Sequence, residues 1–149
     1  MWSHYTNGHQ GIVVGFNAKN RFFAKGDNLM PVVYRSERMN AAYDHTGLKF
    51  LEPNIALLRT KSPDWSYERE WRQFFPVRKC TKLRSESGFV QYFQKLPAKA
   101  IDSVILGVRC ASDTEAAVRE LLRSKELRHV RSQRASLHER DFRLKIVKA

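Results

Sequence analysis

The chain has 149 residues and carries 27 Lys and Arg against 15 Asp and Glu, a net charge of +12. Its hydrophobic content of 42% excludes general disorder, and no apolar run approaches the ~20 residues that a membrane-spanning helix needs. The first residues lack the basic and then apolar layout of a signal peptide. We therefore expect a cytoplasmic protein with no membrane association, built as a single domain over residues 1–149.

Metal and disulfide chemistry are not indicated by the sequence. Cys80 and Cys110 lie far apart without a CxxC motif, and His4 and His9 flank a Gly turn at no zinc-binding spacing. We expect reduced thiols and no metal site.

The N-terminal half predicts short elements separated by turns. Gly11 introduces a β-branched run typical of a strand, and Pro31 is tolerated near the start of another. In chain order we expect a strand at 12–16, a polar loop or hairpin crossing at 17–28, a strand at 29–34, a short helix at 36–43 and a helix at 53–59.

The C-terminal half carries the clearest signals. The run 101–108 predicts a central strand covered on both faces, and Ser112-Asp113-Thr114-Glu115 is a capping box that begins a helix over 112–125. The other expected elements are an exposed loop at 78–88, a strand favoured over a helix at 89–96, and strands at 129–135 and 141–147, the last with Phe142, Leu144 and Ile146 inward. The sum is an α+β fold with a mainly antiparallel or mixed sheet and a few helices.

The stretch from Lys61 to Arg72 has the greatest density of chemically active side chains. Ser62-Pro63 predicts a helix N-cap, and an extended segment over 68–75 would place Glu68, Glu70 and Arg72 on one face. We also expect Trp65 and Trp71 to be largely buried around this segment.

Three interpretations of these charges remain open. Glu68 or Glu70 is a catalytic base or electrostatic stabiliser held by Arg72, or the acids and arginines form a structural ion-pair network, or they are simply exposed. Residue chemistry alone favours the structural network narrowly.

Residues 119–148 are strongly basic, with ten Lys and Arg against four acids. Such a segment is either a nucleic-acid surface or a solvated face of helix and strand. The cations that we assign to a nucleic-acid surface are Arg128, Arg131, Arg134, Arg143 and Lys145.

The order of motifs resembles a known bacterial family. Trp2-Ser3-His4-Tyr5, then Lys61-Ser62 with Tyr67-Glu68-x-Glu70-Trp71-Arg72, then Val104-Ile105-Leu106-Gly107, is similar to the domain-of-unknown-function family 2971. The resemblance spans nearly the whole chain. Members of that family carry a further N-terminal portion, which implies that this chain corresponds to the C-terminal part of a longer domain.

The family pattern is also faintly similar to ADP-ribosyltransferases, which implies a transfer reaction with NAD. In that analogy Glu70 is the catalytic glutamate that steadies the ribosyl cation and its 2'-hydroxyl, and Glu68 orients the acceptor. The analogy also places Tyr5 or His4 against the nicotinamide-ribose pocket. We assign Trp2, Trp65 and Tyr67 to substrate binding, and Arg72, His4 and Tyr5 to the catalytic group with Glu68 and Glu70. A missing N-terminal strand would remove part of the NAD pocket and leave an inactive remnant. The competing class is a non-catalytic nucleic-acid binder.

Overall fold

The computed structural model describes residues 2–24, 29–38 and 53–149, and within these ranges the chain forms two compact units. Unit 1 comprises residues 1–22 and 95–149, and unit 2 comprises residues 23–94. Each unit is described separately below. The prediction that residues 1–149 form a single domain stays a prediction.

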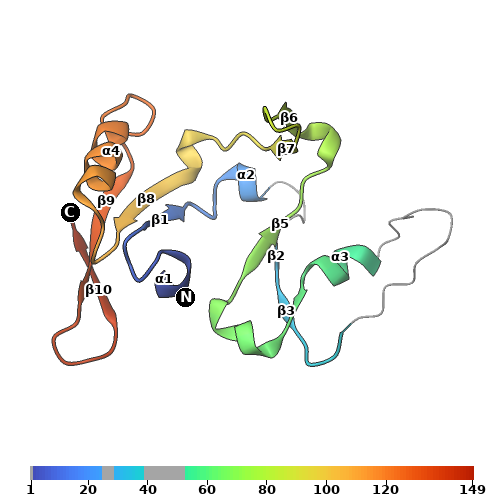
Figure 1. Ribbon diagram of the computed structural model, residues 1–149, viewed down its shortest axis with the longest axis horizontal. Helices are drawn as coiled ribbons and strands as arrows, with labels where there is room; N and C mark the ends of the chain where they lie inside the picture. Colours follow the sequence, from blue (N-terminus) through green and yellow to red (C-terminus); the bar gives the residue numbers. More distant parts are fainter. Residues whose placement is uncertain (1, 25–28, 39–52) are drawn as a thin grey trace. The chain divides into compact units, whose positions relative to one another are not determined.

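Unit 1 is built on a four-stranded sheet with the order β1-β8-β9-β10 (Figure 1). β8 pairs antiparallel with β1 and parallel with β9, and β10 pairs antiparallel with β9. The elements of the unit are α1 (Trp2–Tyr5), β1 (Ile12–Phe16), the 3-10 turn η3 (Ala98–Ala100), β8 (Ile101–Leu106), α4 (Ser112–Leu122), β9 (Arg131–Leu137) and β10 (Leu144–Lys148). The predicted strand at 12–16 and the central strand at 101–108 are therefore confirmed.

The core of unit 1 lies between this sheet and α4. The parallel pairing of β8 with β9 requires a crossover, and α4 supplies it. Val104 and Leu106 from β8 pack with Val118 of α4 and with Val130, and all four are buried. The mixed sheet with few helices confirms the predicted α+β class.

Two details predicted for unit 1 are wrong. The N-cap of α4 is Ala111, which makes no side-chain hydrogen bond, so Ser112 is the first helical residue and the capping box does not form. β10 begins only at Leu144 at the edge of the sheet, which leaves Phe142 fully exposed and Ile146 41% exposed. Apolar residues at every second position predict inward side chains only where the segment is an extended strand with one face covered. Phe142 lies before the strand, and Ile146 lies in the strand but is not covered.

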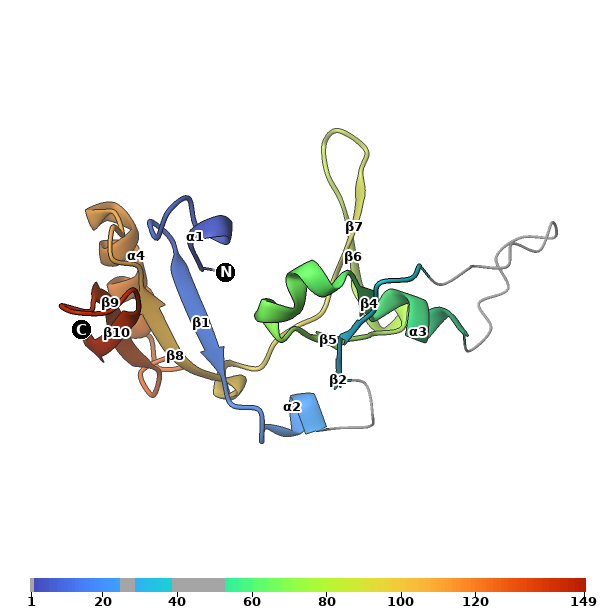
Figure 2. The same cartoon turned by 90° about the horizontal axis from the view of Figure 1, so that it is seen from below.

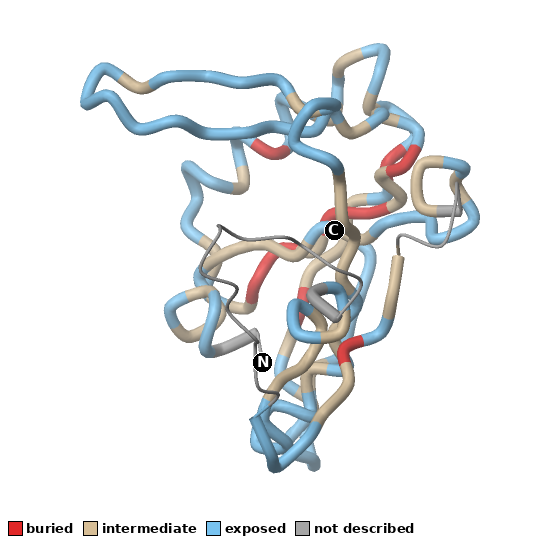
Figure 3. The backbone as a smooth tube through the Cα atoms, turned by 90° about the vertical axis from the view of Figure 1, so that its right-hand side faces the viewer, coloured by how far each residue is buried: buried red, intermediate tan, exposed pale blue. Residues whose placement is uncertain are grey.

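Unit 2 consists of three two-stranded pairings: β2 with β5, β3 with β4, and β6 with β7. Its elements are β2 (Leu29–Pro31), β3 (Val33–Tyr34), α3 (Pro53–Leu58), β4 (Thr60–Lys61), η1 (Pro63–Glu68), β5 (Trp71–Gln73), η2 (Val77–Lys79), β6 (Thr81–Arg84) and β7 (Val90–Phe93), and the helix α2 (Arg21–Ala24) spans the boundary with unit 1. Among its described hydrophobic residues only Val32 is buried. Figure 3 shows that most of the described chain as a whole is intermediate or exposed. Backbone pairing and polar contacts therefore carry much of the organisation of this unit.

Several predictions for unit 2 are confirmed. The helix expected at 53–59 is α3, the strand favoured at 89–96 is β7, and the Ser62 side chain caps η1 by accepting a hydrogen bond from the Asp64 N–H.

No helix within the described ranges is both long enough and apolar enough to span a bilayer.

Other predictions need correction. The strand expected at 29–34 divides at Val32, because Val32 N–H donates to Glu70 while Val33 N–H donates to Arg59. Residues 21–24 form a short helix, residues 81–84 form a strand, and residues 36–38 are not helical. The rest of the helix predicted at 36–43 lies outside the described residues.

The extended segment predicted at 68–75 is also wrong. Glu68 ends η1, Arg69 adopts the left-handed conformation with φ 46°, and only residues 71–73 form a strand. Glu68 therefore does not share a strand face with Glu70.

Candidate functional site

Lys61 is the centre of the polar cluster in unit 2. Its Nζ lies 2.5 Å from Glu68 Oε2 and 3.3 Å from Glu70 Oε2. The Glu68 side chain is only 4% exposed, whereas that of Glu70 is 29% exposed. The two carboxylates that the sequence singled out thus meet through a lysine.

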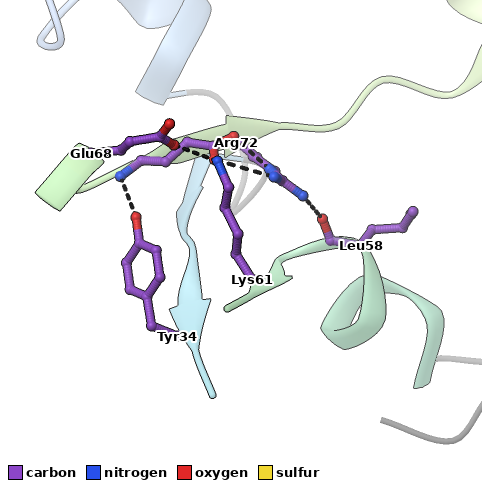
Figure 4. Close-up of polar contacts among 6 residues, drawn as sticks. Tyr34, Leu58, Lys61, Glu68 and Arg72 are labelled. Atoms are coloured by element: carbon purple, nitrogen blue, oxygen red, sulfur yellow. Dashed lines mark hydrogen bonds and ion pairs between the residues drawn. The ribbon is translucent and has the colours of Figure 1, made fainter. Parts of the chain in front are cut away.

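Arg72 is the second cation that contacts Glu70. Its Nε donates to Glu70 Oε1 at 2.6 Å and its Nη2 donates to Oε2 at 3.2 Å, a two-point contact. Its Nη1 donates to the carbonyl oxygen of Leu58 at the end of α3 (Figure 4). The cluster therefore links α3, β4, η1 and β5.

Local backbone geometry brings these side chains together. The left-handed Arg69 ends η1 with its N–H bonded to the Ser66 carbonyl, and the chain turns so that Glu68 faces Lys61. The Glu70 N–H donates to the Tyr34 hydroxyl at 3.0 Å, which fixes β3 against the same turn. The structure thus keeps Glu68, Glu70 and Arg72 together by a different route from the predicted strand.

The contacts within the cluster favour the ionised forms of Lys61, Glu70 and Arg72, whose pKa values are all shifted in that direction. The hydrogen bond from Arg72, with a smaller contribution from Lys61, holds the pKa of Glu70 below its ordinary value of 4.5. The hydrogen bond to Glu68 is the main reason that the pKa of Lys61 is raised above 10.5. By formal charge the two cations of the cluster balance its two acids, and the lowered pKa makes Glu70 poorly suited to accept a proton near neutral pH.

The aromatic residues around the cluster are exposed, which corrects the prediction that they are buried. Trp65 is 41% exposed and Trp71 is 60% exposed. Lys61 Nζ lies 4.7 Å from the Trp65 ring centroid, and the Trp65 and Tyr67 centroids are 6.2 Å apart. The rings therefore offer open π surfaces rather than a wall that would desolvate the carboxylates.

His4 and Tyr5 belong to unit 1, where both lie in α1 with exposed side chains. Trp2 begins the same helix. Their expected approach to Glu70 remains a prediction.

Within residues 2–24, 29–38 and 53–149, no three His, Cys, Asp or Glu side chains gather as metal ligands would.

The predicted nucleic-acid residues fall into two groups. Three are paired with acids: Arg131 with Asp102, Arg134 with Glu115, and Arg143 with Asp141. Arg134 is the main reason that the pKa of Glu115 is lowered. Arg128 and Lys145 are exposed and form no ion pair with a described carboxylate.

Sequence reasoning missed two participants in the cluster. The sequence pattern identifies Lys61 only through the family resemblance, and it gives no signal for Tyr34. Both positions depend on the parallel pairing of β3 with β4, which aligns Tyr34 with Lys61 across strands only two residues long. No periodic pattern in the sequence could signal so short a pairing.

Comparison with known proteins supports a family but no activity. A family model described as "Protein of unknown function (DUF2971)" matches residues 1–73, which include Trp2–Tyr5 and the whole Lys61–Arg72 stretch. The motif at 104–107 lies beyond the matched part. No curated protein and no solved structure matches the chain. Over residues 1–73, just under half of its length, the chain is similar to the family of proteins of unknown function DUF2971.

Proposed function

We propose that this protein binds nucleic acid through the cations of unit 1. The unit carries 15 Lys and Arg against 7 Asp and Glu, a surplus of 8 positive charges. By contrast, the polar cluster of unit 2 neutralises its own charges. The surplus favours a polyanionic partner because bound cations release the counterions condensed on phosphates.

The observation that carries this proposal is the set of cations without a carboxylate partner. These side chains are exposed and form no ion pair with any carboxylate in the described ranges, so their charge is available to phosphates. They are Lys125, Arg128, Arg140, Lys145 and Lys148.

Neutralising two of these cations is expected to weaken binding. The double variant Arg128→Gln, Lys145→Gln should bind a labelled duplex about tenfold less tightly, with a salt dependence reduced by about two phosphate contacts. Fluorescence anisotropy between about 50 and 200 mM salt measures both quantities.

The matched control removes the same charge from paired residues. Arg119→Gln, Arg123→Gln takes two arginines that already face Glu115 and Glu120, and we expect a change of less than about twofold. Equal losses in the two double variants, or no binding by the wild-type chain at low salt, would contradict the proposal.

A second candidate function is ADP-ribosyl transfer with Glu70 as the stabilising carboxylate and NAD as the donor. The supporting observation is that Glu70 has a lowered pKa, remains 29% exposed and contacts Lys61, whose Nζ lies 4.7 Å from the centroid of the exposed Trp65 ring. A fixed anion beside open π surfaces suits a ribosyl cation and a stacked base. In this candidate Glu68 orients the acceptor.

For this candidate, release of nicotinamide from NAD is expected to fall about a hundredfold in Glu70→Gln. The variant keeps the shape of the side chain and removes its charge. Glu120→Gln changes an exposed carboxylate of α4 and should leave the rate unchanged. Absence of nicotinamide release by the wild-type protein, with nucleic acid present as acceptor, would exclude the reaction.

A further inference from the structure

The hairpin β6–β7 is an exposed two-stranded ribbon. All residues of Thr81–Arg84 and Val90–Phe93 are exposed, and the turn between them is closed by hydrogen bonds between Ser85 and Phe89. Figure 2 shows the ribbon extending away from β5 of the same unit. A lone two-stranded hairpin is marginally stable in water, so a partner that covers it would stabilise it.

The register gives the ribbon two chemically different faces. Lys82 lies opposite Tyr92 and Arg84 lies opposite Val90, and directly opposed residues share a face. The other face combines Thr81 with Phe93 and Leu83 with Gln91. One face is therefore basic with an aromatic ring, and the other is uncharged.

The charge of the hairpin region selects among possible partners. Residues 77–93 carry four cations, Arg78, Lys79, Lys82 and Arg84, against the single acid Glu86. None of these four forms an ion pair with a carboxylate in the described ranges. A second copy of the chain would bring like charges together, whereas a polyanion complements them.

We infer that the Lys82–Arg84–Tyr92 face of this hairpin binds single-stranded nucleic acid. The inference rests on the proposed nucleic-acid binding and assigns to it a second surface and a strand preference. Tyr92, 49% exposed and directly opposite Lys82, stacks on a base while Lys82 and Arg84 contact the phosphates on either side. A base must be unpaired to stack on a side chain, so single strands bind here in preference to duplexes.

Adjacent aromatic residues on opposite faces provide a matched test. Tyr92→Ala and Phe93→Ala each remove one ring, of similar exposure, from the same strand. With a labelled oligothymidine of about 12 nucleotides, we expect Tyr92→Ala to weaken binding about tenfold and Phe93→Ala less than about twofold. Tyr92→Phe retains the ring and should restore nearly the wild-type affinity.

Each remaining outcome is decisive. Equal losses in Tyr92→Ala and Phe93→Ala would show that the hairpin acts only through its folding, and would overturn the inference. Duplex binding by the wild-type chain without any effect of Tyr92→Ala on single-strand binding would overturn the inference and leave the proposed function intact. Absence of binding to both kinds of nucleic acid would overturn both.

Discussion

Replacing Lys61 with Met is expected to lower the melting temperature of unit 2 by roughly 10 °C. Methionine keeps the unbranched stem but takes away the cation that lies 2.5 Å from Glu68. Because the Glu68 carboxylate is only 4% exposed, water cannot readily replace Lys61 as its partner. Thermal unfolding followed by tryptophan fluorescence in a Trp2→Phe background reports on Trp65 and Trp71 alone.

The control is the same substitution elsewhere in the unit. Lys82→Met removes an exposed lysine that forms no ion pair with a described carboxylate, and its melting temperature should change by no more than about 2 °C. Equal shifts in the two variants would show that the cluster does not stabilise unit 2, and the structural interpretation of the Glu68–Glu70–Arg72 residues would fail.

The difference in melting temperature between the wild type and Lys61→Met should depend on pH, and the direction of each pKa shift predicts how. Glu70 has a lowered pKa, so its stabilising contribution is present above about 4.5 and disappears as the pH falls through its folded-state pKa. Lys61 has a raised pKa, so its contribution is present below about 10.5 and is lost at higher pH. The melting temperature of the wild type should therefore exceed that of Lys61→Met by the largest amount between about pH 4.5 and pH 10.5, and by less in acid.

Elements whose signal is local in the sequence could be predicted. The β-branched run at 12–16, the apolar run at 101–108 and the Ser62-Pro63 cap formed as expected. In each case neighbouring residues decide the conformation, because a buried strand needs apolar residues in succession and a cap needs an oxygen beside the first turn. The helix at 112–122 also formed, although its cap is Ala111 and Glu115 pairs with Arg119 and Arg134.

Features that depend on distant partners could not be predicted. The strand expected at 29–34 changes partners at Val32, and the segment after Glu68 reverses at Arg69 although arginine has no preference for positive φ. Lys61 became the centre of the site only because β4 pairs with β3. Proximity in sequence is therefore enough to group Glu68, Glu70 and Arg72, but the shared strand face predicted for them does not form.

Leu106→Ala is expected to lower the free energy of unfolding of unit 1 by about 3 kcal/mol. Leu106 is 2% exposed and packs with Val104, Val118 and Val130, so truncation leaves a cavity between β8 and α4. Leu121→Ala, at a 62% exposed position of α4, should cost less than about 0.5 kcal/mol. Hydrogen exchange of the β8 and β9 amides measures the effect within the unit.

In a Trp2→Phe background, the same variant tests the single-domain prediction when tryptophan fluorescence is recorded beside hydrogen exchange. Unit 2 contains Trp65 and Trp71, and none of the core residues around Leu106 lies in it. If residues 1–149 unfold as one cooperative domain, Leu106→Ala must move the fluorescence midpoint and the exchange of β8 by the same free energy. A fluorescence midpoint that stays at the wild-type value would mean that the neutral cluster and the basic sheet unfold independently, and the single-domain prediction would be wrong. Equal changes in the fluorescence midpoint and in the exchange of β8 would mean that the Lys61 cluster and the core around Leu106 unfold together and stabilise each other.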